Sequence, residues 1–334
     1  MTLLSVRDLN VTFGTPEGDV RAVQGVSFDI EPGETVAIVG ESGSGKSVTA
    51  NSLLRLNFGA DVRISGEILL EGRDVLTMTE DEVRSVRGSD MAMIFQDPLT
   101  ALNPFYTVGR QVGEAYAIHH PSATKKELRE IALNSLEKVG IPEPLKRVDQ
   151  YPHEFSGGMR QRIVIAMALV NNPKILIADE PTTALDVTVQ AQILELIAEM
   201  QAQHGSAVIL ITHDLGVVAE ITERVMVMYA GRVVESASVE NTFAVPTHPY
   251  TRGLLKSVKS LDTARHERLE PIPGTPPSLI KLPSGCPFHP RCPFSESLGG
   301  RCSTEAPELR IVGSSRSACH LPDERLLGLM GGAS

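Results

Sequence analysis

Eight residues near the start of the chain constrain its fold more than any other feature. Gly40–Ser47 reads Gly-Glu-Ser-Gly-Ser-Gly-Lys-Ser and matches the pattern G-x-x-x-x-G-K-S at every fixed position. The apolar run Thr35–Val39 precedes this loop, and a helical pattern from Lys46 to about Asn57 follows it. A glycine- and serine-rich surface turn is a poorer interpretation, because it would not need Lys-Ser at its end. The pattern therefore predicts an α/β fold in which this loop binds phosphate groups.

The residue types of the loop suit a nucleotide with its magnesium ion. Glycines let backbone N–H groups surround the β-phosphate, and the N-terminus of the following helix adds partial positive charge. Lys46 is expected to reach the β- and γ-phosphates of ATP, and the Ser47 hydroxyl to help hold Mg²⁺. The loop residues expected to bind the nucleotide are Gly40, Ser42, Gly43, Gly45, Lys46 and Ser47.

A second candidate site lies where another apolar strand ends. Ile175–Ala178 is followed directly by Asp179 and Glu180, and ligands of open α/β folds bind at such strand ends. Asp179 is expected to interact with Mg²⁺, directly or in its second coordination sphere, and Glu180 to orient the attacking water as general base. Taken alone, the pair is a weak signal, because structural ion-pair networks also gather carboxylates. Downstream of a phosphate-binding loop, it favours nucleotide hydrolysis.

The order of the remaining patterns indicates a large α/β domain followed by a smaller one. A helical pattern over Val187–His204 and a strand pattern over Val208–Thr212 continue a βαβ alternation, which is typical of a parallel sheet with flanking helices. Prolines and charged helical spacing predict a helical subdomain inserted at about residues 97–160. After about residue 240 the chain becomes irregular and rich in proline. We therefore expect one domain over residues 1–240 and a second over residues 241–334.

Composition and charge exclude several classes of function. Hydrophobic residues make up 42% and charged residues 22%, which is ordinary for a globular protein. The net charge of −10 argues against a nucleic-acid partner, because proteins that bind phosphate backbones present basic surfaces. The longest apolar run, Ile163–Val170, is far shorter than the roughly 20 residues that cross a bilayer. With no signal-peptide pattern at its N-terminus, the chain is expected to stay in the cytoplasm.

A short segment in the middle of the chain distinguishes between the many phosphate-loop NTPases. Phe155–Arg162 reads Phe-Ser-Gly-Gly-Met-Arg-Gln-Arg and resembles the signature motif of ATP-binding-cassette (ABC) proteins, with Phe155 where leucine is common. Physically it is a second helix N-terminus with two glycines, which suits an anion. An ordinary helix N-cap at Ser156 is the alternative, which the full eight-residue match disfavours. In ABC proteins this motif contacts ATP bound by the opposite subunit, so the resemblance implies a dimer with nucleotide between two cassettes. The residues expected to make this contact are Ser156, Gly157, Gly158 and Gln161.

Other elements of the ABC family follow in the expected order. Gln96 matches the glutamine loop, which senses Mg²⁺ and links to membrane subunits, and His213 matches the switch histidine that hydrogen-bonds the γ-phosphate. Ala184–Asp186 matches the D-loop, which implies that Asp186 lies at the dimer seam. Phe13 occupies the position of the aromatic residue that stacks on adenine, with an ordinary core phenylalanine as the alternative. The residues that the resemblance makes catalytic are Glu180, His213 and Gln96.

Two further segments narrow the resemblance within this family. Gln96–Pro104 and Thr247–Thr251 are similar to segments of the dipeptide/oligopeptide importer ATPases, and the second opens their C-terminal extension. A simple helix start with proline in its first turn also explains the second segment and is compatible with it. The resemblance implies a RecA-like parallel sheet with an antiparallel β subdomain over residues 1–240, and an oligopeptide-transporter-type extension over residues 241–334.

The resemblance also implies partners and a location. It describes an ATPase subunit on the cytoplasmic side of the cell membrane that couples ATP hydrolysis to uptake of dipeptides or oligopeptides. Its partners would be a second, related but different ABC ATPase subunit, two transmembrane permease subunits and, indirectly, an extracytoplasmic peptide-binding protein. Nickel and glutathione importers use the same type of motor and stay open as alternatives. A soluble ABC ATPase of translation or DNA repair is less favoured, because such proteins usually carry two cassettes or a long coiled-coil insertion.

Four cysteines lie close together near the C-terminus. Their spacing is C-x5-C-x9-C-x16-C, formed by Cys286, Cys292, Cys302 and Cys319. Structural zinc favours close C-x2–4-C pairs, which are absent here, whereas four thiolates spread over irregular chain suit a [4Fe–4S] cluster better. The dipeptide-type subunits of the family resemble this arrangement and are linked to such a cluster. Zinc, free thiols and disulfides stay open as alternatives, and His289 and His320 are possible substitute ligands.

Overall fold

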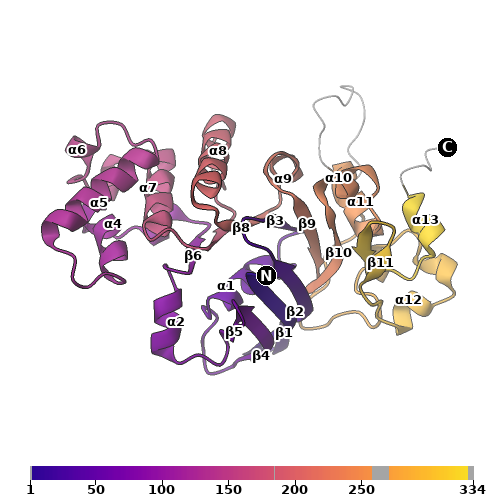
Figure 1. Ribbon diagram of the computed structural model, residues 1–334. Helices are drawn as coiled ribbons and strands as arrows, with labels where there is room; N and C mark the ends of the chain where they lie inside the picture. The colour runs from indigo at the N-terminus through magenta and orange to yellow at the C-terminus, as the bar shows by residue number, and fades with distance from the viewer. Residues whose placement is uncertain (1, 184, 258–270, 330–334) are drawn as a thin grey trace. The chain divides into compact units, whose positions relative to one another are not determined.

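The computed structural model describes residues 2–183, 185–257 and 271–329 (Figure 1). The chain divides into two compact units. Unit 1 comprises residues 1–3, 30–34 and 77–211, and unit 2 comprises residues 4–29, 35–76 and 212–334. Among the described residues, no helix combines the length and the apolar character that crossing a membrane requires.

Unit 1 is organised around parallel strands. They are β6 (Met91–Ile94), β7 (Ile175–Asp179) and β8 (Ala207–Thr212), and β7 lies between the other two. Every residue of these strands is buried, as expected for a parallel sheet that is covered on both faces. Because β6 and β7 run in the same direction, the residues that follow them, Phe95 and Glu180 onward, lie at the same edge of the sheet.

Helices make up most of the rest of unit 1. Their bounds are α2 (Glu80–Val86), α3 (Pro98–Ala101), α4 (Val108–Ala117), α5 (Lys125–Lys138), α6 (Pro144–Arg147), the 3-10 turn η1 (Pro152–Glu154), α7 (Gly157–Leu169) and α8 (Val187–His204). Helix α4 packs against α5 and α7, and the three lie together in Figure 1. A capping box begins α5, because the Thr124 hydroxyl accepts a hydrogen bond from the Glu127 N–H and the Thr124 N–H donates to the Glu127 carboxylate at 2.7 Å.

The strands of unit 2 fall into two groups. One sheet has the order β2-β1-β4-β5, and its strands are β1 (Leu4–Thr15), β2 (Gly18–Ile30), β4 (Val62–Leu70) and β5 (Arg73–Asp74). The other group consists of β3 (Thr35–Val39), β9 (Arg224–Tyr229), β10 (Arg232–Ser238), β11 (Arg310–Val312) and β12 (Ser315–Ser317). Strand β3 runs parallel to β9, whereas β9–β10, β10–β12 and β12–β11 pair antiparallel. The C-terminal hairpin β11–β12 therefore extends the group that contains β3.

Short helices complete unit 2. They are α1 (Lys46–Leu53), α9 (Leu215–Ile221), α10 (Val239–Ala244), α11 (Pro249–Ser257), α12 (Arg301–Thr304), α13 (Asp323–Leu327) and the 3-10 turns η2 (His289–Arg291) and η3 (Ser295–Leu298). The irregular, proline-rich composition after residue 240 predicts the loops of this region, but it does not reveal the hairpin that joins the sheet. We call residues 241–334 the C-terminal segment from here on.

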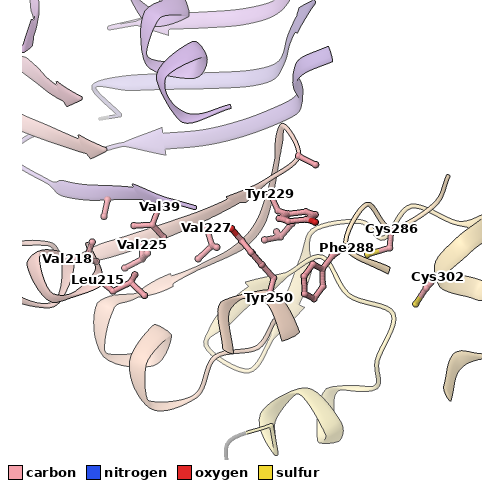
Figure 2. Packing of buried hydrophobic residues seen from close by; sticks show 13 residues of the cluster. Val39, Leu215, Val218, Val225, Val227, Tyr229, Tyr250, Cys286, Phe288 and Cys302 are labelled. Atoms are coloured by element: carbon pink, nitrogen blue, oxygen red, sulfur yellow. The ribbon is translucent and has the colours of Figure 1, made fainter. Parts of the chain in front are cut away.

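The C-terminal segment shares a hydrophobic core with the strands β3 and β9 (Figure 2). Three aromatic rings from different parts of unit 2 meet in it: Tyr229 at the end of β9, Tyr250 in α11, and Phe288 before η2. The ring centroid of Tyr229 lies 4.6 Å from that of Tyr250 and 5.2 Å from that of Phe288. Since β3 leads directly into Gly40–Ser47, this core connects the C-terminal segment to the base of the phosphate-binding loop.

A buried carboxylate connects β10 to the C-terminal segment by hydrogen bonds. Glu235 is buried, and its carboxylate accepts hydrogen bonds from the Thr247 N–H at 2.7 Å, the Thr247 hydroxyl at 2.8 Å and the His248 N–H at 2.9 Å. We expect Glu235→Ala to lower the free energy of unfolding by about 2–4 kcal/mol, because it leaves buried donors without an acceptor. Urea unfolding measures this, with Glu240→Ala at an exposed position of α10 as control. If both variants lower the free energy of unfolding equally, the hydrogen bonds to the Glu235 carboxylate do not stabilise the fold as expected.

Candidate functional site

The loop Gly40–Ser47 joins β3 to α1, as its sequence pattern predicts. Two of its glycines, Gly40 and Gly45, are required by close approach of neighbouring backbone. A Cβ atom at Gly40 would lie 2.2 Å from the Met228 carbonyl oxygen, and one at Gly45 would lie 2.4 Å from the Ala22 carbonyl oxygen. Gly45, which caps α1, also has a φ of 102°, a left-handed conformation that favours glycine. The loop is therefore pressed against the strands β2 and β9, with the N-terminus of α1 at its end.

Lys46 is held inside this loop. Its side chain is buried, and its ammonium group donates hydrogen bonds to the carbonyl oxygens of Gly40 at 2.9 Å and Glu41 at 3.1 Å. Ser47 follows it as the second residue of α1. The loop backbone thus surrounds a buried positive charge, and the N-terminus of α1 lies next to it. Both features favour the binding of an anion.

Within unit 1, the structure brings Gln96 and Glu180 together. The Gln96 amide Nε2 donates a hydrogen bond to Glu180 Oε2 at 3.0 Å, and the Thr183 hydroxyl donates to the same oxygen at 2.9 Å. Glu180 has a left-handed backbone with φ of 47°, and its N–H donates to the Ile211 carbonyl oxygen at 2.8 Å. Asp179 precedes it as the last residue of β7 and is buried. The structure thus orients the Glu180 carboxylate by two donors at the end of a buried strand.

The signature segment forms the start of α7. Ser156 is the N-cap, its hydroxyl accepts a hydrogen bond from the Met159 N–H at 3.4 Å, and both Ser156 and Gly157 are exposed. Gly158 is partly buried beside Val189. Gln161 is only 1% exposed, so its side chain lies in the interior of the unit rather than at the exposed helix start. The helix N-terminus is open to solvent, and the contact of these residues with a nucleotide stays a prediction.

The remaining predicted residues have the following positions. Asp186 caps α8, accepting a hydrogen bond from the Val189 N–H at 3.0 Å, whereas Ala184 lies outside the described residues. His213 is exposed and directly follows β8. Phe13 is partly buried in β1, opposite Val62 of β4. Their contacts with nucleotide stay predictions.

Two family models match this chain. The model described as "ABC transporter" matches residues 23–183, and the model described as "Oligopeptide/dipeptide transporter, C-terminal region" matches residues 234–298. The dipeptide transport ATP-binding protein DppD of Bacillus subtilis is 53% identical over 325 residues, which cover 97% of this chain and 96% of that protein. The oligopeptide transport ATP-binding protein OppD of Escherichia coli is 50% identical, with 97% and 95% covered. This chain belongs to the ABC transporter ATPases with an oligopeptide/dipeptide transporter C-terminal region.

A solved structure agrees with this membership. The ATP-binding cassette MJ0796, determined as a dimer in a post-hydrolysis state with ADP and Pi, has a TM-score of 0.63 and 29% identity to this chain. The match covers 71% of this chain and 98% of the cassette. The predicted α/β cassette fold and the assignment as an ATP-hydrolysing ABC subunit are therefore confirmed.

The ABC family resemblance also predicts a metal centre at the four cysteines. All four are free thiols, of which Cys286, Cys302 and Cys319 are buried and Cys292 is partly buried. Burial raises the pKa of the Cys286 thiol to about 12 and that of the Cys292 thiol to about 11, although backbone N–H groups of Phe288 and Phe294 oppose the shift. The four thiols are correct in number and type for a cluster. Their positions do not match a metal site, since the described part of the chain contains no group of three or more His, Cys, Asp or Glu residues that could hold a metal ion.

Both histidines that were possible substitute ligands have one ring nitrogen occupied. His289 Nδ1 lies 2.9 Å from the Cys286 carbonyl oxygen, and His320 Nε2 lies 2.9 Å from the Glu305 carbonyl oxygen. The disulfide alternative is not realised, because the structure pairs none of the four cysteines. The [4Fe–4S] cluster and the zinc alternative are not supported by this arrangement.

Sequence reasoning missed two residues that contact the predicted site. Thr183 shares the Glu180 oxygen with Gln96, and its only sequence signal is its place in the turn that follows the two acids. Glu41 occupies a variable position of the loop pattern, yet its backbone and its side chain both make contacts within unit 2. A variable position carries no signal in a motif, so only the structure could identify it.

Proposed function

We propose that this ABC ATPase is the motor subunit of a bacterial importer that takes up dipeptides or oligopeptides. The observation that carries the proposal is the near-complete alignment with transport proteins for these substrates, which includes the C-terminal region as well as the cassette. A cassette alone would indicate an ABC protein of any kind. The C-terminal region is the part that favours peptide transport over other cargo.

The proposed mechanism assigns a role to each part of the site. ATP with Mg²⁺ binds at Gly40–Ser47, with Lys46 on the phosphates, and two cassettes close around two nucleotides. Glu180 polarises the attacking water and His213 stabilises the γ-phosphate, after which the dimer reopens. ATP drives closure because it bridges the two surfaces and ADP cannot, so the two states differ in affinity for it. The hydrogen bond from Gln96 to Glu180 supports coupling of the glutamine loop to the catalytic carboxylate.

The proposed partners follow from the same role. A second ABC ATPase subunit, related but different, would supply the opposite cassette, and two permease subunits would form the membrane path. An extracytoplasmic binding protein would deliver the peptide. The chain would then lie at the cytoplasmic face of the membrane as a peripheral subunit, without a nucleic-acid partner.

Purification from native membranes tests the proposal. An affinity-tagged chain, extracted in mild detergent, is expected to co-purify with two permeases and a second ATPase. The same complex in liposomes is expected to accumulate a radiolabelled dipeptide or tetrapeptide only when ATP is enclosed with the cassettes. Accumulation of Ni²⁺ or glutathione in place of peptide would show that the substrate is not a dipeptide or oligopeptide. A chain recovered without any membrane subunit would overturn the transporter assignment.

We also propose that the four cysteines, which do not form a metal-binding group in the structure, come together around a [4Fe–4S] cluster when iron and sulfide are supplied. Four thiols on irregular chain provide the ligands, and backbone N–H groups near Cys286, Cys292 and Cys319 hydrogen-bond their sulfurs, as is common around such clusters. Protein purified without oxygen is expected to be brown and to contain iron and acid-labile sulfide in equal amounts, both lost when all four cysteines become serine. Zinc in place of iron, or no metal at all, would contradict the cluster.

A further inference from the structure

The C-terminal segment holds one residue of the phosphate-binding loop by its side chain. Both terminal guanidinium nitrogens of Arg291 contact the Glu41 carboxylate, with Nη1 donating to Oε2 at 2.6 Å and Nη2 donating to Oε1 at 3.0 Å. The Arg291 side chain is 4% exposed and that of Glu41 is 26% exposed. A bidentate pair with one partner buried has a fixed geometry, unlike an ion pair between two mobile surface side chains.

Further contacts fix this pair in place. Arg291 Nε donates to the Pro273 carbonyl oxygen at 2.9 Å, and Nη1 also lies 3.3 Å from the Tyr229 hydroxyl. The Glu41 N–H donates to the Tyr250 hydroxyl at 2.8 Å. Tyr229 and Tyr250 belong to the aromatic core shown in Figure 2, so the groups that hold Glu41 are themselves packed. The backbone and the side chain of one loop residue are thus both held by the C-terminal segment.

The charge of Glu41 matters because of where it lies. It is the second residue of a loop whose chemistry suits a polyphosphate, and its own carbonyl oxygen accepts a hydrogen bond from the Lys46 ammonium. A free carboxylate at this position would repel the phosphates of a nucleotide. In the ion pair, the positive charge of Arg291 compensates the negative charge of Glu41. The same pair holds Glu41, whose carbonyl oxygen contacts Lys46, in position.

We propose that Arg291 is a positioning residue for the nucleotide site, through which the C-terminal segment neutralises Glu41 and sets the affinity of the phosphate-binding loop for ATP. This inference rests on the proposed binding of ATP at Gly40–Ser47. It assigns to the C-terminal segment a role in the ATPase reaction itself, in addition to its place in the family's architecture.

The test is a cycle of charge changes, read out by equilibrium binding of a fluorescent ATP analogue to the full chain. Arg291→Met is expected to weaken binding by about tenfold, because it leaves the Glu41 carboxylate unpaired beside the phosphates. Glu41→Gln in the same background is expected to restore affinity to within about twofold to threefold of the parent, since no charge is left to repel. A purely structural role predicts no such rescue, because the second change also removes a charged contact.

The dependence of binding on the nucleotide and on the ionic strength distinguishes charge repulsion from misfolding. The loss in Arg291→Met is expected to be larger for ATP than for ADP, and it should shrink when the ionic strength rises from low salt to about 0.5 M. Arg310→Met is the matched control, because Arg310 pairs with Asp323 within the same C-terminal segment and not with a loop residue. It should bind ATP like the parent. Thermal unfolding of every variant reports whether the chain is folded.

Each outcome of the cycle decides the inference. Equal affinities in the parent and Arg291→Met, or a double variant as weak as the single one, would overturn it. If Arg291→Met does not fold, Arg291→Lys and Glu41→Gln take its place: the lysine should retain most of the affinity, and the glutamine should bind at least as tightly as the parent. Lys46→Ala separates the two proposals, because unchanged binding there would reject the nucleotide site. Lost binding there, with parental binding in Arg291→Met, would reject only the role of Arg291.

Discussion

Glu180→Gln is expected to stop ATP turnover while leaving ATP binding intact. The two donors that orient the carboxylate, Gln96 and Thr183, can still hydrogen-bond an amide oxygen, so the substitution preserves the local geometry. An amide has no basicity with which to polarise water, and general-base catalysis typically contributes about 10²- to 10⁴-fold. We therefore expect phosphate release to fall by at least about 100-fold, with ATP affinity within about twofold of the parent.

The same variant should accumulate a closed dimer in the presence of ATP, because hydrolysis is the step that reopens the cassettes in the proposed mechanism. Size-exclusion chromatography with and without ATP measures this. Glu195→Gln, an identical change at an exposed position of α8, is the control and should hydrolyse ATP like the parent. Phosphate release from Glu180→Gln at the parental rate would show that another group is the base.

The sequence best predicts the parts of the site whose structure depends on residues that are neighbours in the chain. The loop Gly40–Ser47 needs glycine where neighbouring backbone lies closer than van der Waals contact to a Cβ position, and the 2.2 Å and 2.4 Å approaches at Gly40 and Gly45 explain why the pattern fixes these residues. Strand β7 is likewise predicted by a run of apolar residues that ends in two acids. Here local sequence and local structure carry the same information.

The features that the sequence does not reveal depend on residues far apart in the chain. Arg291 and Glu41 are separated by 250 positions, and no periodicity or spacing relates them. The hairpin β11–β12 is short, and only its pairing with β10 makes it part of the sheet. The cysteines show the opposite case, because their spacing predicts a metal centre while the grouping of the described residues does not provide one. Side-chain grouping follows from tertiary packing and from bound ligands, neither of which spacing specifies.

Lys46→Ala is expected to abolish measurable ATP binding. The ammonium group is buried and donates to two loop carbonyls, so it is the fixed positive charge of the loop, and a hydrogen bond from a charged donor contributes about 1.5–3 kcal/mol. Loss of this contact and of its charge on the phosphates should weaken binding by at least about 100-fold. Titration calorimetry measures the affinity directly, and the rise in melting temperature that ATP causes in the parent should disappear.

A control is needed because Lys46 also contacts the loop itself. Lys174→Ala removes a lysine of unit 1 that is ion-paired with Asp90 at 3.2 Å, and it should leave ATP binding unchanged. The Lys46→Ala chain without ATP should melt as a folded protein, because the helix α1 and the strand β3 do not depend on the ammonium group for their backbone hydrogen bonds. If the folded variant binds ATP with parental affinity, the loop Gly40–Ser47 does not hold the phosphates. The roles proposed for Glu180 and Arg291 would then have no substrate to act on.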